Sequence, residues 1–326
     1  MKNKLIFIII LLISCGLPPK QKAISILQQG VKDESIIIRV NAAKGLKQTG
    51  DARGIKTLYE TLKCKDKNGI AAALAVLYDL GENTFSPVLV KLVDHNDPLI
   101  RSEAYKVISL IDDERCLEIF IKGINDKVAK IRRTSFLGLK RFRKKRTIMK
   151  GLRDIDPLTR IVAAQALGSI GQQDMENFIR KEMVTQTIDI WKQGIISLAE
   201  MGDTSAIPFI KESLVDAPWE LRLAAAEALL ILNNQDGVDV LKQGLQSNNP
   251  FTRVKVVQIL KKFNLPEGSQ LLKEAVKDEY INVSIVAIEA LAKYKAKEHQ
   301  TLFAEMMGAP NPLLKIAAAT AYLQSE

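Results

Sequence analysis

The chain is poor in cysteine, histidine and aromatic residues. Its 326 residues include three Cys, two His and 6% aromatic residues. Three cysteines cannot build a disulfide framework, and two histidines leave little for histidine-based metal or triad chemistry. With 18 Gly and 11 Pro the chain is unlike collagen or a low-complexity segment. It is 47% hydrophobic, which excludes intrinsic disorder, and it carries a net charge of +10. Because the apolar content comes from Ala, Leu, Ile and Val, packed helices are favoured over a barrel or sandwich.

The first fifteen residues form a separate segment. Lys2 and Lys4 precede an apolar run of nine residues at 5–13. A membrane-spanning helix needs about 20 apolar residues, so a short run behind basic residues is typical of a secretory signal peptide. The run ends in Leu12-Ile13-Ser14-Cys15, an aliphatic residue, one free position, a small residue and a cysteine.

This ending resembles the lipobox of bacterial lipoproteins. The resemblance implies that residues 1–14 are a signal peptide, that Cys15 carries acyl chains such as palmitate, and that 15–19 are a tether. It places the protein in the bacterial cell envelope. Gly16 stands where an Asp would favour inner-membrane retention, so the outer membrane is preferred, and the side of the membrane stays open. The alternative is an uncleaved hydrophobic start with an incidental cysteine.

The rest of the chain repeats with a period of 31 residues, and one repeat is shortened to 28. Three residues after an arginine column stand small residues such as Ala104 and Ala163, and seven residues after it stands a leucine column. These positions share one face of a helix, so small residues allow close approach and leucines fill the core. The columns follow six arginines: Arg39, Arg101, Arg132, Arg160, Arg222 and Arg253.

Helix signals frame each repeat. Ser, Asp, Thr or Asn stands four residues before the arginine column, where its side chain would cap a helix. Pro follows several of these caps at the first helical position, where the missing N–H costs nothing. Gly or Asn stands eleven residues after the column, as at Gly50 and Gly202, and tolerates the left-handed turn that ends a helix. Each repeat is therefore predicted to be a cap, a first helix, a tight turn and a second helix.

The pattern resembles the HEAT-like repeats of the phycobilisome lyases. Asp-Pro-Leu-Ile-Arg at 97–101, Asp-Pro-Leu-Thr-Arg at 156–160 and the Gly-Asp turns at 50–51 and 202–203 carry the resemblance. It implies an all-α fold, an α-α superhelix of about nine to ten repeats over residues 20–326, as one continuous solenoid rather than two domains. Tetratricopeptide and ankyrin repeats differ in period and signature residues. The ninth repeat departs from the pattern, with Ser284 in the arginine column.

Three sets of basic residues are candidate sites. The resemblance implies that the arginine column is a structural ladder, each Arg pairing with an acidic residue of a neighbouring unit; an anion-binding row is the alternative. The second helices carry recurring lysines, which we expect to line the concave surface as a positive stripe, although lysine is also the default solvated helix residue. These lysines are Lys91, Lys122, Lys150, Lys181, Lys211, Lys242 and Lys273.

The densest charge lies at a predicted turn in the shortened repeat. Runs of this kind suggest an anionic partner, and the expected location favours an acidic protein, anionic lipid or lipopolysaccharide over nucleic acid. A merely solvated turn is the alternative, and Phe142 within the run is expected to pack in the core. The residues concerned are Arg133, Lys140, Arg141, Arg143, Lys144, Lys145, Arg146 and Lys150.

The sequence offers no catalytic motif, and we expect no enzyme activity, cofactor or metal site. It has no His-Glu dipeptide of the kind that binds di-iron in some HEAT-like enzymes, no Gly-rich phosphate loop and no nucleophile elbow. The function expected is a lipid-anchored scaffold outside the cytoplasm that binds a protein or another anionic partner near a membrane. If Cys15 is not lipidated, an enzyme of the lyase or DNA-glycosylase type is the alternative. The identity of the partner and the oligomeric state stay open.

Overall fold

The computed structural model describes residues 16–184 and 187–326, so the predicted signal peptide and the lipidation of Cys15 lie outside the described residues. Over those two ranges the regular structure is helical, with no β-strand. The helices pack in sequential pairs, which confirms the predicted all-α solenoid. Among the described residues no helix is both long and apolar enough to cross a membrane.

The first helix of each pair carries the arginine column and is usually the longer one, because its caps and turn are the best defined. These helices are α3 (Ile36–Gln48), α5 (Lys67–Asp79), α7 (Pro98–Ile108), α9 (Ala129–Arg141), α11 (Pro157–Gly168), α13 (Ile188–Glu200), α15 (Trp219–Ile231), α17 (Pro250–Lys262), α19 (Ile281–Lys295) and α21 (Pro312–Gln324).

The second helices are mostly shorter, and three of them include a 3₁₀ turn. They are α4 (Ala52–Thr61), α6 (Pro87–Leu92), α8 (Cys116–Gly123), α10 (Lys145–Ile148) with η1 (Met149–Arg153), α12 (Met175–Met183), η2 (Thr204–Ala206) with α14 (Ile207–Glu212), α16 (Val238–Leu245), α18 (Gly268–Ala275) and η3 (Ala296–His299) with α20 (Gln300–Met306); α2 (Pro19–Gly30) precedes the first pair.

The caps and turns follow the sequence signals. The carboxylate of Asp97 accepts the N–H of Leu99 at 3.0 Å, and the side chain of Asn311 accepts two N–H groups at the start of α21. Gly50, Gly81, Gly171 and Gly202 all have positive φ, as the predicted left-handed turns require. In the shortened repeat Arg143 takes this place, with φ 50°. Side-chain caps are absent at Ser35 and Thr187, although both helices start there as predicted.

The two predicted columns form the core. Every member of the leucine column from Leu46 to Leu291 is at most 3% exposed, and the small residues of the other column are buried as well. The small column allows a first helix to approach the second helix before it. A Cβ added to Gly151 would lie 2.5 Å from the Cβ of Ala163, for example. Repeated burial of this kind lets neighbouring repeats within a compact unit cover one another.

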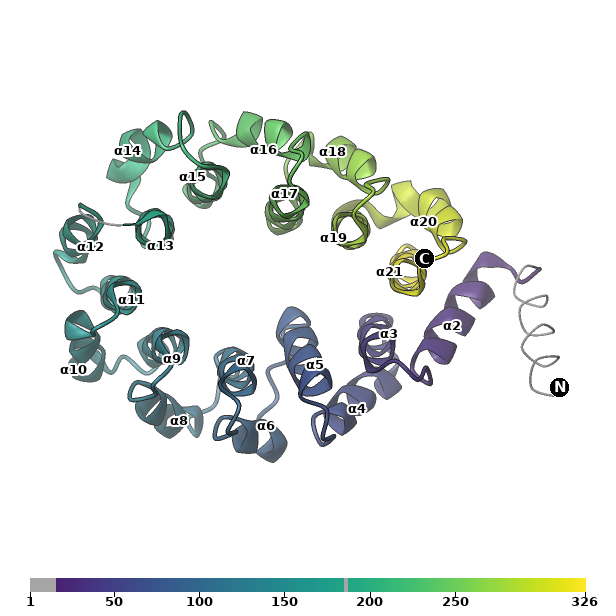
Figure 1. The fold of residues 1–326 in the computed structure, drawn as a ribbon, viewed down its shortest axis with the longest axis horizontal. Coiled ribbons are helices and arrows are strands. Elements are labelled where there is room, and N and C mark those ends of the chain that lie inside the picture. Colours follow the sequence, from purple (N-terminus) through teal and green to yellow (C-terminus); the bar gives the residue numbers. More distant parts are fainter. Residues whose placement is uncertain (1–15, 185–186) are drawn as a thin grey trace. The chain divides into compact units, whose positions relative to one another are not determined.

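The chain divides into two compact units, and both boundaries fall inside helices, α5 and α17. Unit 2 is Leu77–Val256. Within it, Figure 1 shows α7, α9, α11, α13 and α15 along the inner side of an arc and the second helices along its outer side. The first helices pack directly on one another, α9 on α11 and α13 on α15, and α11 and α15 are rich in alanine. Because successive first helices pack together, their layer follows a shorter path than the layer of second helices. The arc therefore curves toward the first helices.

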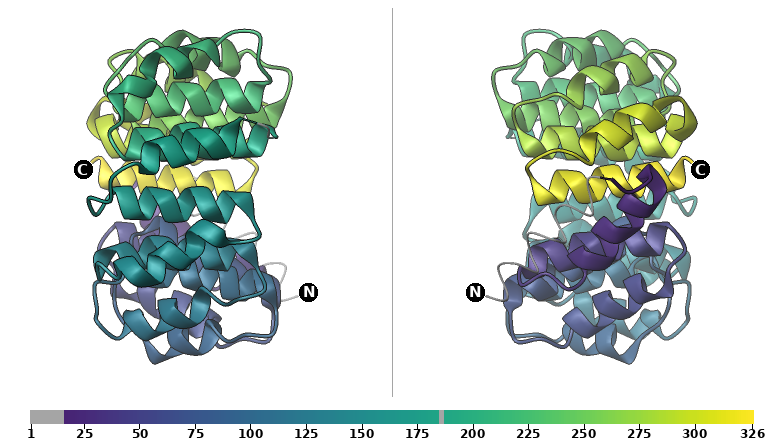
Figure 2. Two further views of the ribbon diagram at one scale, coloured as in Figure 1. Left: turned by 90° about the vertical axis from the view of Figure 1, so that its left-hand side faces the viewer. Right: turned by 90° about the vertical axis from the view of Figure 1, so that its right-hand side faces the viewer.

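Unit 1 contains the chain up to Val76 together with Val257–Glu326. Here the two ends of the described chain meet, because α2 and α3 both pack against α21 (Figure 2, right). Lys44 of α3 donates to Glu289 of α19 at 2.6 Å, and Lys20 pairs with Glu326 at 2.6 Å. In unit 1 the N-terminal helices therefore cover one flank of the last helix, α21.

Candidate binding surfaces

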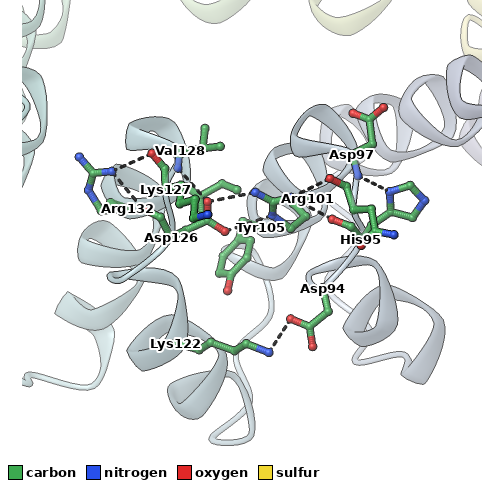
Figure 3. A network of polar contacts seen from close by, with 12 residues as sticks. Asp94, His95, Asp97, Arg101, Tyr105, Lys122, Asp126, Lys127, Val128 and Arg132 are labelled. Carbon is green, nitrogen blue, oxygen red and sulfur yellow. Dashed lines mark hydrogen bonds and ion pairs between the residues drawn. The ribbon is translucent and has the colours of Figure 1, made fainter.

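The arginine column is held inside the repeats by two kinds of contact. Arg101 binds both carboxylate oxygens of Asp126, at 3.1 and 3.2 Å, and donates to the carbonyl of His95 at 3.0 Å (Figure 3). His95 in turn accepts the N–H of Asp97 through Nδ1, which fixes the loop before α7. The guanidinium of Arg101 therefore joins the loop before α7 to the loop after α8.

The next two arginines repeat this arrangement. Arg132 binds Asp154 with contacts of 2.7 and 2.8 Å, and Arg160 binds Glu182 at 2.7 and 2.9 Å. The side chains of Arg132 and Asp154 are only 12% and 9% exposed. Burial acts to raise the pKa of Asp154, but hydrogen bonds from Arg132 and the N–H of Asp156 outweigh it and lower that pKa. The pKa of Asp126 is lowered in the same way, against burial, by Arg101 and the N–H of Val128.

Several side chains at the arginine-column position donate a hydrogen bond to the backbone carbonyl six residues earlier. Arg39 donates to the carbonyl of Asp33 at 2.6 Å, and Arg253 to that of Ser247 at 2.8 Å. Ser284 keeps the bond, since its hydroxyl donates to the carbonyl of Asp278 at 2.9 Å. Arg222 differs, because it reaches Leu214 and Gln243 and lies 4.3 Å from the centre of the Trp219 ring. These contacts are structural, and they leave the guanidinium groups little freedom to bind an external anion.

The lysines of the second helices do not line the inner side of unit 2. They lie on the outer layer, so the prediction of a concave positive stripe is wrong there. The reason is the direct packing of successive first helices, which makes their layer the inner side of the arc. Lys122 pairs with Asp94 at 2.6 Å, and Lys211 and Lys242 pair with Asp236 and Asp239. The remaining four, all exposed and without a partner among the described side chains, are Lys91, Lys150, Lys181 and Lys273.

The basic turn of the shortened repeat separates into held and unpaired residues. Arg133 binds Asp156 at 2.9 Å, and Arg141 reaches back to the carbonyl of Ser109 at 3.0 Å, so both are used within the fold. The ring of Phe142 lies 6.3 Å from that of Phe120. The other cations are exposed and have no ionic or hydrogen-bonded side-chain partner in the described part of the chain; we call them the basic patch: Lys140, Arg143, Lys144, Lys145, Arg146, Lys150 and Arg153.

Two features of this region were not predicted from the sequence. Beside Arg153 of the basic patch two apolar side chains are exposed, Met149 at 47% and Ile155 at 91%. Hydrophobic periodicity predicts a regular second helix here, whereas the structure has one short α-helix followed by a 3₁₀ helix. The sequence signal for this change is the repeat length, which is three residues shorter than in the other repeats. The shorter length indicates a changed second helix, but it does not indicate which side chains become exposed.

The cysteines and histidines of the described chain have structural surroundings. Cys116 is buried, and this burial raises the pKa of its thiol to about 11, whereas Cys64 is half-buried; both are free thiols. His299 is 2% exposed and shares a 3.1 Å hydrogen bond with the hydroxyl of Ser269. Among the described residues no group of three or more His, Cys, Asp or Glu side chains is placed to hold a metal ion.

Paired helices, a repeated core and an arginine ladder define an α-solenoid repeat protein. The model of the HEAT repeats matches residues 55–140, 145–230 and 214–283. The chain therefore belongs to the HEAT-repeat family. No curated protein matches the sequence significantly.

Several solved structures are similar at low identity. Human deoxyhypusine hydroxylase in complex with glycerol is 16% identical, with 77% of this chain and 97% of that chain covered and a TM-score of 0.34. The complex of CpcE and CpcF of phycocyanin lyase from Nostoc sp. PCC7120 is 15% identical, with coverage of 94% and 95% and a TM-score of 0.35. Kap121p is 13% identical, with 94% of this chain and 40% of that chain covered and a TM-score of 0.39.

Proposed function

We propose that this protein is a lipid-anchored HEAT-repeat scaffold of a bacterial cell envelope, which binds a protein partner next to a membrane and catalyses no reaction. The observation that carries the proposal is the order of features at the N-terminus. A basic start, a short apolar run and the Leu12-to-Cys15 ending lead directly into α2, which begins at Pro19.

The short tether would fix where the scaffold works. Pro19 lies four positions after Cys15, and an extended chain spans at most about 3.6 Å per residue. An acylated Cys15 would therefore keep the start of unit 1 within about 15 Å of the membrane surface. Two or three acyl chains give stable anchoring where one chain gives only reversible binding. The proposal favours the outer membrane, from Gly16, and leaves the leaflet open.

The anchor is tested by exchanging the cysteine. In a bacterial host fed labelled palmitate, the wild-type chain should incorporate label, lose residues 1–14 and sediment with membranes. Cys15→Ala should abolish the label and leave an unprocessed precursor, and globomycin should cause the wild-type precursor to accumulate. Cys64→Ala is the matched control and should change none of these results. Unaltered processing and fractionation of Cys15→Ala would refute the anchor.

The scaffold role has a separate test. The wild-type protein is crosslinked in intact cells, and any captured protein is then purified and titrated against the purified chain. A one-to-one complex with a saturable affinity supports the scaffold. Turnover of a substrate that a single point change abolishes would favour the enzyme alternative and would reject this part of the proposal.

A further inference from the structure

The basic patch lies in the one repeat whose length differs from the rest. Between Arg132 and Arg160 the period shrinks to 28 residues, and the second helix becomes α10 followed by η1. From residue 127 to residue 153 the chain contains no acidic residue. Asp154 follows Arg153 directly, but its carboxylate is bound by Arg132, and no patch cation has an ionic or hydrogen-bonded side-chain partner in the described chain.

The patch runs from the turn along the exposed face of α10 and η1. Ile148 and Gly151 point to the core, where Gly151 lies against Ala163 and Phe136. The opposite face carries Arg146, Met149, Lys150 and Arg153, at the spacing of one helical face. In unit 2, α10 belongs to the outer layer of helices (Figure 1). The exposed side chains of this face are therefore accessible to a large, flat partner.

Exposed apolar side chains accompany the charges. Met149 lies between Arg146 and Lys150 on the same face, and Ile155 follows Arg153 in the loop before α11. Basic residues interleaved with exposed apolar ones are typical of surfaces that enter the headgroup region of a membrane. The aromatic residue of the turn, Phe142, packs near Phe120, and the patch itself has no exposed aromatic side chain that could stack on an unpaired base.

We propose that the basic patch binds the anionic phosphate headgroups of a phospholipid bilayer, with Met149 and Ile155 inserting among them. Each Lys or Arg close to an anionic bilayer contributes roughly a fivefold gain in binding, and the gain falls with salt. The lysine-rich composition suits mobile headgroups, because lysine acts as a point charge and needs no fixed geometry. Such a surface would act as a second membrane contact beside a lipid anchor.

Vesicle binding of the full chain tests the proposal. Every sample carries Cys15→Ala, so that no acyl chain is attached, and binding is measured as the ratio between phosphatidylglycerol-containing and pure phosphatidylcholine vesicles. The N-terminal segment is common to all variants, so this ratio isolates the charge effect. Exchange of Lys144, Lys145, Arg146 and Lys150 to Gln should lower the ratio by about 100-fold or more at low salt.

A matched control removes the same charge elsewhere. Lys63, Lys91, Lys181 and Lys273 are exposed and unpaired in the described chain, and each lies in a different repeat. Their joint exchange to Gln should change the ratio less than about threefold, since they are scattered over separate repeats. Equal losses in the two quadruple variants would show that only net charge matters and would overturn the proposal.

Two further results decide between partners. Ile155→Ser and Met149→Ser remove exposed apolar surface without changing the charge, so each should weaken binding to anionic vesicles and leave binding to a single-stranded RNA homopolymer unchanged. Patch-dependent binding to that RNA, with no preference for anionic vesicles, would overturn the lipid proposal in favour of nucleic acid. Because all samples lack the acyl chain, a negative vesicle result would not argue against lipidation of Cys15. Equally, evidence against lipidation would not change the expected result of the vesicle assay.

Discussion

Two neighbouring repeats use their charges in opposite ways. Residues 98–128 contain five Lys and Arg with six acidic residues, and four of the five cations are in ion pairs. Residues 129–156 contain eleven Lys and Arg with two acidic residues. Four of these cations are paired and the seven of the basic patch are not. Both repeats keep the ladder, through Arg101 and Arg132.

The difference separates structural charge from available charge. The ladder recurs at Arg101, Arg132 and Arg160, and its charges are neutralised inside the fold by carboxylates. The patch occurs once and opposes folding slightly by self-repulsion, since nothing in the described chain neutralises it. A charge that recurs with the repeat is thus best explained by contacts within the fold, whereas the unpaired charges of the basic patch are available to a partner from outside it.

The largest expected effect comes from breaking the ladder in the basic repeat. Asp154→Ala leaves the guanidinium of Arg132 buried without its carboxylate, which should lower the free energy of unfolding by about 3 kcal/mol. Urea unfolding followed by circular dichroism measures it. Asp112→Ala is the control, because Asp112 is 88% exposed in its 3.6 Å pair with Arg141, and it should cost less than about 0.5 kcal/mol. Similar losses for the two variants would contradict a structural ladder.

Acid is expected to lower the free energy of unfolding by a smaller amount, and both repeats should contribute to this loss. The pKa values of Asp126 and Asp154 lie below the ordinary value of 3.8, so the folded chain binds fewer protons than the unfolded chain. Their stabilisation is complete above that value and is lost as the pH falls through the lowered pKa. Unfolding measured from pH 6 to pH 2 should show this loss. The double variant Asp126→Asn, Asp154→Asn should flatten the acid slope, and an unchanged slope would assign it to other carboxylates.

The smallest effect is expected from the patch itself. Exchange of Lys144, Lys145, Arg146 and Lys150 to Gln removes four exposed, unpaired cations and should change the free energy of unfolding by less than about 0.5 kcal/mol. The direction should be toward higher stability, because repulsion is relieved. Thermal unfolding at low and high salt provides the measurement. A loss above about 1 kcal/mol would mean that these residues hold the repeat together.

Periodicity predicted the helices and the core well, because one helix pair repeats and each column has one role. The leucine column is buried throughout, and the glycines of the turns take positive φ as predicted. The curvature was not predictable from the columns. The inner layer of the arc is the one whose successive helices touch one another. The sequence of a single repeat does not show whether the first helices or the second helices of successive repeats touch.

The candidate site was predicted only in part. The run at 140–146 marked the basic turn, but the sequence could not show that Arg133 and Arg141 are used by contacts to Asp156 and to the loop after α7. These partners lie 23 and 32 positions away in the chain, and whether an arginine reaches them depends on the backbone geometry. The exposure of Met149 and Ile155 arises from the 3₁₀ geometry of η1 and its loop, which no column predicts.

The meeting of α2 and α3 with α19 and α21 in unit 1 has a consequence for folding. Lys44 and Glu289, joined by a hydrogen bond, are 245 positions apart in the chain, whereas the ladder contacts span fewer than thirty. Contacts of such high sequence separation form late, since the chain must first close a very long loop. Repeats of unit 2 can assemble in order as the chain emerges, but α2 must wait for α21. The N-terminal helices should therefore be the last to gain hydrogen-exchange protection during refolding.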